Sequence, residues 1–280
     1  MKKISALLLM VLLVLTLSAC NTPAPAAPQP QVKTLRVAME CGYAPYNWSQ
    51  ENDANGAVAI ADSKNFANGY DVSMAKLIAE AGGYQLQIVR LDWDSLIPAL
   101  QSGEVDAVIA GQSITAERLE QVDFSDPYYY ASIVTLTNKD SIYAKAKGLS
   151  DLAGGTATSQ LGTVWYDVCL PQIENANILP AQESAPSMLV ALNSKAVDYV
   201  VCDLPTAMAA VQVNENLVIL DFTGTEDDFE VSEEEVNLGI SVKKGNTQLL
   251  EVINGVLSEL TVEDFEEMMD AAIAIQPLSE

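Results

Sequence analysis

The alternation of hydrophobic and polar positions divides residues 34–280 into short strands and longer helices. Apolar side chains alternate over residues 35–39 and 86–89, with the period of two that is typical of strands. Between such runs the apolar residues recur at helical spacing, and Gly83 and Gly103 mark helix ends. Strands that alternate with helices predict an α/β fold with largely parallel sheets.

Each predicted element has its own local signal. Residues 43–66 are expected to form a long polar loop, because they contain Pro45, Gly56 and several asparagines and aspartates. Asp71, Asp94 and Thr115 are predicted to cap helices through their side-chain oxygens. Strands are expected at 35–39, 86–89, 105–110, 156–159, 197–202, 217–220 and 238–242, and helices at 71–82, 95–102, around 118, after 162–164, at 185–193, from about 205, at 246–260 and at 263–273.

The first nineteen residues have the pattern of a secretory signal. Lys2 and Lys3 precede an apolar run over residues 7–17, which is too short to span a membrane. The following Leu-Ser-Ala-Cys20 resembles the lipobox of bacterial lipoproteins, which implies cleavage before Cys20 and its lipidation; an ordinary signal that happens to end in cysteine is the alternative. Residues 20–33 are rich in proline and alanine and predict an extended tether.

Composition excludes several classes of function. The chain carries 38 acidic and 14 basic residues, for a net charge of −24, which should repel nucleic acid, although simple solubility also explains it. It contains no histidine, which removes Ser-His-Asp and Cys-His nucleophile systems and the usual zinc sites. We therefore expect no enzyme activity, no metal and no cofactor. Cys169 and Cys202 either form a disulfide or stay free and buried like Cys41.

One segment of the chain is echoed by another. Residues 96–111 match residues 188–203 at a constant offset of 92, so that Asp106 corresponds to Asp198 and Gly111 to Asp203. Any helix–turn–strand unit resembles another to some degree, but the match favours two lobes of similar build. Ligands of open α/β sheets bind beyond the carboxyl ends of the strands. Gly111 and Asp203 are therefore predicted to face each other across a cleft.

Several stretches, taken together and in this order, resemble a known family. They are residues 96–103, 106–118, 122–129, 160–163, 197–198 and 238–245. The chain is similar to the type II periplasmic amino-acid-binding proteins of solute-binding protein family 3, the receptors of polar amino acid ABC importers. The resemblance implies two α/β lobes, 34–132 with 237–280 and 133–236, joined by a two-strand hinge. It also implies a monomer that captures a free amino acid outside the cytoplasm and delivers it to an ABC permease.

The charged groups of a free amino acid need partners in such a cleft. Arg118 is the candidate for the carboxylate, since its planar fork matches two oxygens; a surface ion pair is the alternative. The resemblance adds Ser113, Thr163 and Val164, where the family commonly has a second hydroxyl in place of Val164. It assigns the ammonium to Asp203, with help from Gly111 and Ser113. Asp203 is also placed to cap the helix that follows it.

The remaining expected contacts belong to the ligand side chain. By resemblance, Tyr43 and Trp93 sandwich it, although core packing would also explain both aromatics. Glu40 and Gln112 are expected to line this part of the pocket, and the acid at Glu40 favours a polar or basic ligand. Asp123, Ser125 and Tyr128 are expected to support the hinge rather than contact the ligand.

Two other functions use the same scaffold. Some relatives are dehydratases, and Glu40 could serve as their acid, but Arg118 together with Asp203 suits a zwitterion better than a dicarboxylate. A ligand-sensing lipoprotein without a transporter is the second alternative. Substrate turnover would distinguish the enzyme, and neighbouring permease and ATPase genes would favour the importer.

Overall fold

The computed structural model describes residues 32–277. The predicted signal, Cys20 and the tether up to residue 31 lie outside the described residues. Within residues 32–277, no helix combines the length and the apolar composition that a membrane span requires.

The first lobe is built on a five-stranded sheet. Its strands are β1 Thr34–Met39, β6 Gln85–Arg90, β7 Ala107–Val108, β8 Val122–Tyr130 and β14 Asn237–Lys243. They lie in the order β6-β1-β7-β14-β8. β1 pairs in parallel with β6 and β7, whereas β14 is antiparallel to β7 and to β8. Four strands therefore share one direction, and their carboxyl ends lie at one edge of the sheet.

The second lobe repeats this arrangement. Its strands are β9 Ile133–Asn138, β10 Thr156–Thr158, β11 Asn177–Ile178, β12 Tyr199–Asp203 and β13 Leu217–Leu220. They lie in the order β11-β10-β12-β9-β13, with β9 antiparallel to both of its neighbours. In each sheet the reversed strand, β14 or β9, occupies the fourth position. The two lobes thus share one topology, as the internal echo predicted.

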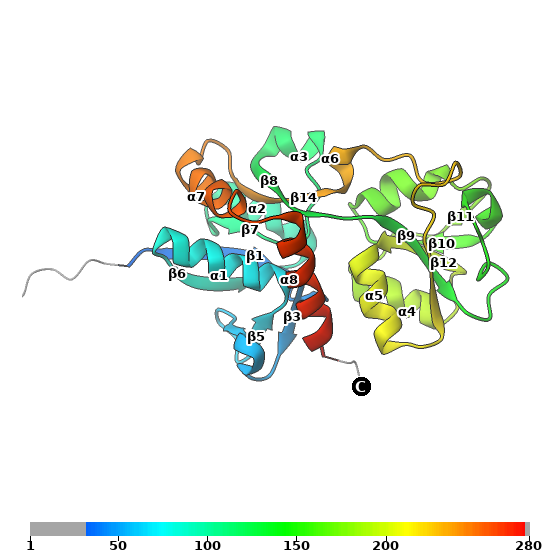
Figure 1. Cartoon of the computed structure of the whole chain (residues 1–280), viewed down its shortest axis with the longest axis horizontal. Helices are drawn as coiled ribbons and strands as arrows, with labels where there is room; N and C mark the ends of the chain where they lie inside the picture. Colours follow the sequence, from blue (N-terminus) through cyan, green and yellow to red (C-terminus); the bar gives the residue numbers. More distant parts are fainter. Residues whose placement is uncertain (1–31, 278–280) are drawn as a thin grey trace, which may run out of the picture. The chain divides into compact units, whose positions relative to one another are not determined.

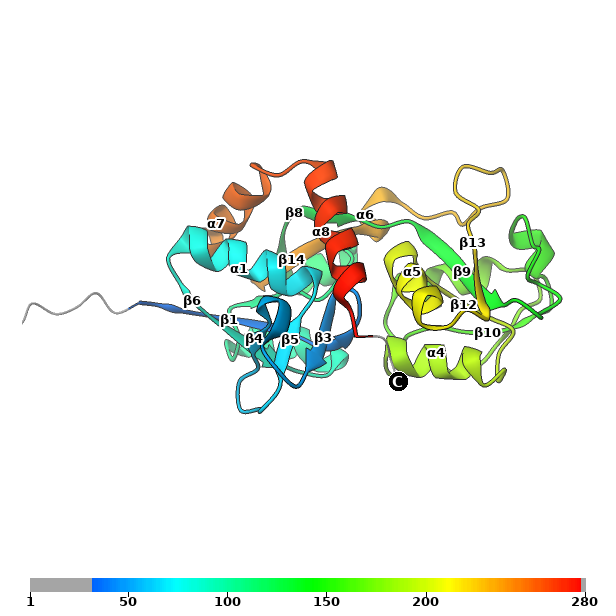
Figure 2. The same cartoon turned by 60° about the horizontal axis from the view of Figure 1, so that its bottom comes forward.

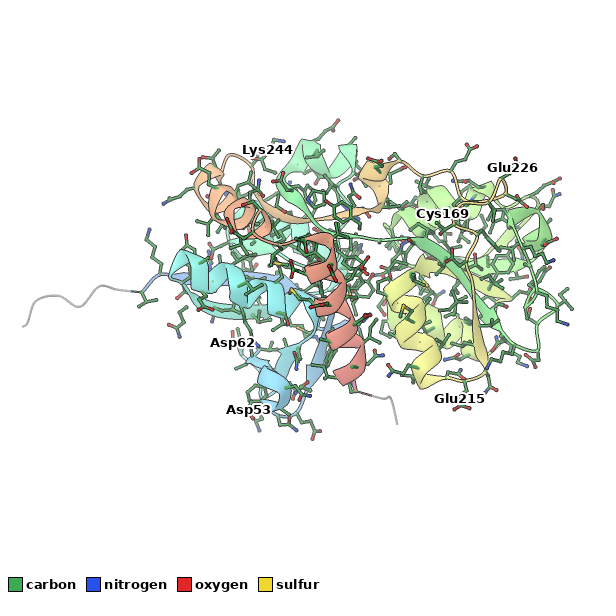
Figure 3. The ribbon with its side chains drawn as sticks, in the orientation of Figure 1. Asp53, Asp62, Cys169, Glu215, Glu226 and Lys244 are labelled. Carbon is green, nitrogen blue, oxygen red and sulfur yellow. The ribbon has the colours of Figure 1, made fainter. Side chains whose placement is uncertain are left out.

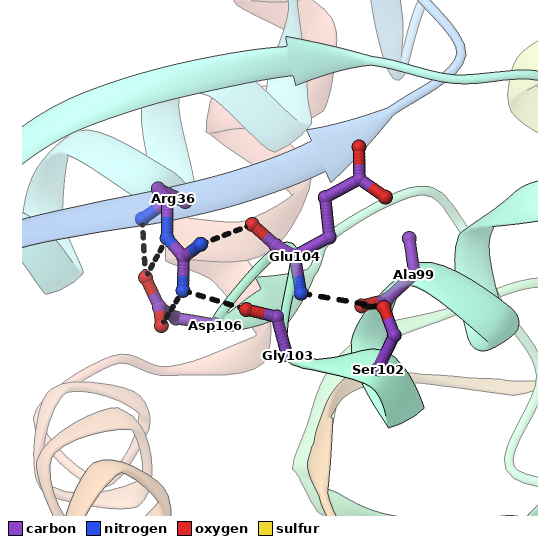
Figure 4. Close-up of polar contacts among 6 residues, drawn as sticks. All are labelled: Arg36, Ala99, Ser102, Gly103, Glu104 and Asp106. Atoms are coloured by element: carbon purple, nitrogen blue, oxygen red, sulfur yellow. Dashed lines mark hydrogen bonds and ion pairs between the residues drawn. The ribbon is translucent and has the colours of Figure 1, made fainter.

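The echo extends to side-chain contacts. Asp106 accepts a hydrogen bond from the backbone N–H of Arg36 at 2.9 Å, and Asp198 accepts one from Thr156 N–H at 2.8 Å. Each aspartate thus ties the turn before a central strand, β7 or β12, to the neighbouring parallel strand of its own lobe, β1 or β10. In the first lobe the Arg36 guanidinium adds an ion pair to Asp106 at 2.7 Å and further bonds to the carbonyls of Gly103 and Glu104 (Figure 4).

Helices cover both sheets. They are α1 Tyr70–Gly82, α2 Leu96–Ser102, α3 Ala116–Gln121, α4 Ala185–Asn193, α5 Leu204–Val213, α6 Glu233–Val236, α7 Thr247–Leu257 and α8 Val262–Ile275. α1 packs on β6 and α7 on β8, while α4 and α5 pack on β12. The last helix, α8, contacts α1 and β8 of the first lobe and α5 of the second (Figures 1 and 2).

Two chain segments connect the lobes side by side. β8 leads directly into β9, and α6 leads back into β14. Ala131 N–H donates to the Val236 carbonyl at 3.3 Å, and Tyr130 pairs with Asn237. Ser125 supports this region, because its hydroxyl accepts from Ile240 N–H at 3.0 Å. The expected two-strand connection is therefore present.

The expected loop over residues 43–66 is wrong in part. A small antiparallel sheet forms there in the order β2-β3-β5-β4, with β2 Gly42–Tyr43, β3 Asn47–Gln50, β4 Val58–Ala59 and β5 Phe66–Asn68. These strands are two to four residues long, which is too short to show an alternation that would reveal them. Long-range pairing, such as that of Trp48 with Asn68, decides them.

Two predicted helix caps are also wrong, whereas two others are confirmed. Asp71 is the second residue of α1, and its buried carboxylate faces the core instead of the helix end. Asp94 lies inside a short 3-10 turn, and α2 begins after Ser95 without a side-chain cap. Thr115 does accept from Arg118 N–H at the start of α3, and Asp203 caps α5.

Many acidic side chains are exposed, whereas three cysteines are buried. The acidic side chains of Asp53, Asp62, Glu215 and Glu226 lie on the outside of the fold, where water screens their mutual repulsion (Figure 3). Cys41, Cys169 and Cys202 are buried and free. The structure therefore has the second of the two alternatives for the cysteines, and no bond joins Cys169 to Cys202.

Candidate functional site

The ends of four strands meet at one small cavity. Residues just beyond β1, β7, β10 and β12 contribute to it, as expected for ligand sites of open α/β sheets. The cavity measures about 20 Å³, which is room for about one water molecule. Its walls are Tyr43, Trp93, Gly111, Ser113, Arg118, Ala131, Ile133, Gln160, Thr163, Val164, Trp165, Asp203, Glu235, Val236 and Leu238.

Eight of the ten residues predicted from the sequence line this cavity. They are Tyr43, Trp93, Gly111, Ser113, Arg118, Thr163, Val164 and Asp203. Gln112 lines an adjoining open cleft of about 660 Å³, which shares Trp93, Arg118, Thr163, Val164 and Glu235 with the cavity. Glu40 lines neither of these spaces. The structure therefore gathers most of the predicted residues around one point between the lobes.

Arg118 brings an unpaired positive charge to the cavity. Its guanidinium donates to the carbonyl oxygens of Ser113 and Gly162, each at 2.9 Å. The ion pairs found within residues 32–277 do not include it. Burial lowers the pKa of Arg118 to about 10, although Glu117 and Asp167 act to raise it. The side chain stays charged at neutral pH and can still bind an anion.

Trp93 packs against this guanidinium. The Arg118 Cζ atom lies 5.4 Å from the centroid of the Trp93 ring, which is within the range of a cation–π contact. The indole therefore holds the arginine in place. An aromatic face beside the cation also leaves a flat apolar surface at the cavity wall.

Asp203 brings a buried negative charge to the opposite wall. It is 1 % exposed, and its Oδ1 caps α5 by accepting from Thr206 N–H at 2.8 Å. Its Oδ2 accepts from the Tyr43 hydroxyl at 2.6 Å, a bond that joins the two lobes. Burial raises the pKa of Asp203, while the bonds from Thr206 and Tyr43 oppose that rise. No basic group forms an ion pair with Asp203 among the described residues.

Tyr43 is packed tightly at the wall of the cavity. Its ring stacks on Tyr46 with centroids 4.7 Å apart and lies 6.2 Å from the Trp165 ring. Gly111, at a φ of +62°, accommodates the ring, because a Cβ there would lie 2.7 Å from a Tyr43 carbon. The close approach explains why a glycine is needed at this position.

The segment 160–164 forms the wall in the second lobe. The Thr163 hydroxyl donates to the Gln160 carbonyl at 2.7 Å, so its proton is already engaged. Val164 precedes a short π-helical turn, Trp165–Cys169, and offers no polar side-chain atom. Polar contact with a ligand from Val164 would therefore have to come from its backbone.

Seven wall residues were not predicted from the sequence: Ala131, Ile133, Gln160, Trp165, Glu235, Val236 and Leu238. Gln160 is 2 % exposed, and its Nε2 has no hydrogen-bond partner within the described residues. A buried amide without a partner beside a cavity is placed to serve a ligand. Gln160 belongs to one of the stretches that resemble the family, residues 160–163, and this resemblance was the signal that could have identified it. Trp165 and Glu235 had no local signal, because only the fold brings them to the cavity.

Glu40 lies behind the cavity, near the Gln160 amide. Burial raises the pKa of Glu40 to about 7, and the nearby Asp92, Asp71 and Asp94 add to the rise. Gln160 acts in the opposite direction, although its amide makes no hydrogen bond of good geometry. Such a carboxylate gains most from a cationic neighbour, because a positive charge would offset both burial and repulsion.

This arrangement suits a small molecule that carries both charges. A guanidinium on one wall and a carboxylate on the other can bind an anionic and a cationic group at the same time. Nothing in the residues 32–277 is arranged like a metal centre, since no cluster of three acidic or cysteine side chains is placed to hold an ion.

Comparisons with known proteins agree with this geometry. Residues 35–270 match the model of the bacterial extracellular solute-binding proteins, family 3. A probable histidine-binding protein of Neisseria gonorrhoeae is 30% identical over 251 residues, which are 88% of this chain and 86% of that protein. The arginine-binding extracellular protein ArtP of Bacillus subtilis is 33% identical over 59% of this chain and 58% of its own length.

A solved structure is similar over nearly the whole body. An amino acid ABC transporter substrate-binding protein of Streptococcus pneumoniae, bound to L-arginine, superposes with a TM-score of 0.74. It is 28% identical and covers 86% of this chain and 94% of its own. The family model spans far more than half of the sequence, and the fold and topology agree. The chain belongs to the bacterial extracellular solute-binding proteins, family 3.

Proposed function

We propose that this protein captures a free amino acid between its lobes and delivers it to the permease of an ABC importer. The observation that carries the proposal is a pair of oppositely charged side chains at one cavity, the half-buried Arg118 and the buried Asp203, which have no ion-pair partners among the described residues. Buried charges are unfavourable unless they are paired, so a zwitterion satisfies both at once. The lobes comprise residues 34–132 with 237–280 and residues 133–236.

The ten predicted site residues and Gln160 then each have a role. Arg118 binds the ligand carboxylate in its fork, with Ser113, Thr163 and the backbone of Val164 beside it. Asp203 accepts from the ammonium, assisted by Gly111 and Ser113. Tyr43 and Trp93 flank the ligand side chain, while Glu40, Gln112 and Gln160 bound its far end. The assignment of Gln160 rests on its unsatisfied buried amide.

Binding requires the cavity to change. A space of about 20 Å³ holds a water molecule and no amino acid. Tyr43 lines that space, and its hydroxyl is bonded to Asp203 across the lobes. We propose that the lobes part about the two crossing segments, that an ammonium replaces the Tyr43 hydroxyl on Asp203, and that the lobes close on the ligand.

A basic amino acid is the favoured ligand. Glu40 has a raised pKa of about 7 and lies near Asp92 and Asp94, so a cationic side chain would relieve the repulsion among them. The relatives support the same choice, because one is named for histidine and two are named for, or solved with, arginine.

The location follows from the N-terminal sequence and the family. A signal over residues 1–19 and a lipid on Cys20 would hold the body outside the cytoplasm, on the outer face of the membrane or in a periplasm. We propose that the protein acts there as a monomer. The family consists of binding proteins, so the dehydratase alternative has no support beyond the shared scaffold.

A thermal-shift screen of the purified protein against the twenty amino acids and ornithine tests the proposal. We expect arginine, histidine, lysine or ornithine at about 100 times its Kd to add roughly 2.7 kcal/mol to the free energy of unfolding. Refolding beforehand removes any ligand carried through purification. A shift with none of the amino acids would contradict the proposal, and a shift confined to acidic or apolar ones would contradict the preference for basic ligands.

Replacing Glu40 with glutamine is expected to reduce the preference for arginine over glutamine as ligand by about tenfold. A charge-assisted contact contributes roughly 1.5–3 kcal/mol, and the substitution keeps the shape while removing the charge. Calorimetric titration of both ligands measures the ratio. Glu104→Gln is the matched control, because Glu104 is exposed. An unchanged ratio in Glu40→Gln would show that Glu40 takes no part in ligand choice.

A further inference from the structure

A chain of buried hydrogen bonds connects two pocket loops behind the cavity. Asp71 Oδ1 accepts from the Tyr128 hydroxyl at 2.6 Å, and that hydroxyl accepts from Gly111 N–H at 2.9 Å. Asp71 Oδ2 accepts from Asn47 Nδ2 at 2.7 Å, and Asn47 Oδ1 accepts from Cys41 N–H at 2.7 Å. The side chains of Asn47, Asp71 and Tyr128 are each 0 % exposed.

The ends of the chain lie in the loops that carry the proposed ligand contacts. Cys41 stands between Glu40 and Tyr43, and Gly111 directly precedes Gln112 and Ser113. Both donors belong to residues in the left-handed region, Cys41 at a φ of 54° and Gly111 at 62°. Cys41 pays a conformational cost for this backbone, and its N–H needs a partner because it is buried. The network gives each of these two N–H groups an acceptor, Asn47 Oδ1 for Cys41 and the Tyr128 hydroxyl for Gly111.

Asp71 only accepts hydrogen bonds within this network. Along each arm every group donates toward the carboxylate, so Asp71 is the final acceptor of both arms. An ionised carboxylate accepts on both oxygens, whereas an amide accepts on only one. Asparagine at position 71 would therefore leave one arm without its acceptor, with two donors facing each other.

We infer that Asn47, Asp71 and Tyr128 act as positioning residues that fix both pocket loops, and that ligand affinity depends on the one buried charge they share. The inference rests on the proposed function for its affinity readout. It extends the expected hinge support of Tyr128 to the pocket itself. None of the three side chains lines the cavity, so they act through Cys41 and Gly111.

An exchange of two side chains separates positioning from simple packing. In the double variant Asn47→Asp/Asp71→Asn, the carboxylate introduced at position 47 would accept from Cys41 N–H and from the new amide at position 71. The oxygen of that amide would accept from the Tyr128 hydroxyl. Every donor again has an acceptor, and one negative charge remains. Asp71→Asn alone leaves two donors opposed, and Asn47→Asp alone places two carboxylates together.

The test combines arginine titration with NMR of the unliganded protein. We expect Asp71→Asn, Asn47→Asp and Tyr128→Phe each to weaken the Kd for arginine about tenfold or more, and the exchange to restore it to within about threefold. Tyr199→Phe is the matched control, because its buried hydroxyl donates to the Leu152 carbonyl away from the cavity. It should leave the Kd within about twofold.

The NMR readout does not need a ligand. Tyr128→Phe should move the amide resonance of Gly111 and speed its hydrogen exchange at least about tenfold, with no such change in Tyr199→Phe. If arginine fails to bind even the unmodified protein, the proposed ligand is wrong, and this readout alone decides the network. An unmoved Gly111 amide, an unchanged Kd in a folded Asp71→Asn, or a folded exchange variant without recovered affinity would overturn the inference. Should Asp71→Asn not fold, Tyr128→Phe and the exchange variant still decide.

Discussion

Replacing Arg118 with alanine is expected to abolish most amino-acid binding while leaving the unliganded protein folded. The substitution removes one partner of a desolvated ion pair, which costs about 3–5 kcal/mol and weakens the Kd roughly 100- to 5,000-fold. The unliganded protein should lose no more than about 1 kcal/mol. Two hydrogen bonds to carbonyl oxygens disappear, but so does the cost of burying a guanidinium without a carboxylate.

Comparison with other arginine substitutions makes this result specific. Arg118→Lys keeps the charge but loses the planar fork, so we expect it to bind at least about tenfold more weakly. Arg36→Ala is the matched control, because Arg36 pairs with Asp106 inside the first lobe. It should lower the melting temperature and leave the ligand-induced shift intact. The reverse outcome, with Arg118→Ala still stabilised by ligand, would show that the carboxylate binds elsewhere.

Lowering the pH from about 8 to about 5 is expected to stabilise the unliganded protein and to weaken ligand binding. Burial raises the pKa of Glu40 to about 7 and that of Asp71 to about 6, and it also raises the pKa of Asp203. Each group binds a proton in the folded state at a pH where the unfolded chain has already lost it. Stability from these groups is therefore present at low pH and is lost as the pH rises through the folded pKa.

The size of the effect follows from the shifts. Between pH 8 and pH 5, Glu40 should contribute about 2–3 kcal/mol and Asp71 about 1 kcal/mol to the free energy of unfolding. The same protonation removes the charge that a basic side chain needs, so the Kd for arginine should weaken about tenfold, as expected for Glu40→Gln. Asp140, Asp227 and Asp264 have lowered pKa values and lose their stabilising contribution only at pH values below this window.

Urea unfolding and arginine titration at each pH measure the two trends. Lowering the pH also relieves the general repulsion among the acidic residues, which stabilises the folded protein as well. The pH dependence of the unmodified protein therefore cannot by itself be assigned to Glu40. Glu40→Gln provides the control, because it should remove about 2 kcal/mol of the pH dependence and most of the change in arginine affinity. Stability that falls from pH 8 to pH 5 would contradict the raised pKa values.

Local pattern in the sequence was sufficient for the main elements, and the family resemblance supplied most of the candidate site. Strands such as β1 and β6 and helices such as α7 follow from apolar periodicity, which reports directly on which face is buried. The internal echo predicted matching lobes, and the family resemblance placed eight of ten proposed residues at the cavity. Arg118 stood out as one of only 14 basic residues in the chain, and the resemblance added Asp203 directly after a predicted strand.

What the sequence did not reveal depends on contacts between distant residues. The sequence predicted Asp71 to cap a helix. In the structure it is the centre of a buried hydrogen-bond network, because the hydroxyl of Tyr128, 57 positions away, donates to it. The small sheet over Gly42–Asn68 consists of strands of two to four residues that only pairing stabilises. The ligand contact proposed for Gln160 depends on the finding that its buried amide has no hydrogen-bond partner among the described residues.

The sequence by itself determined the alternation of strands and helices and the kinds of charge available for a ligand, and it predicted an N-terminal signal. The tertiary structure decided how those charges meet, with Tyr43 bonded to Asp203 across 160 positions and the cavity reduced to the size of a water molecule. The reason is physical: local propensity and periodicity act over a few residues, whereas desolvation, charge and cavity size are set by neighbours that only the folded chain brings together.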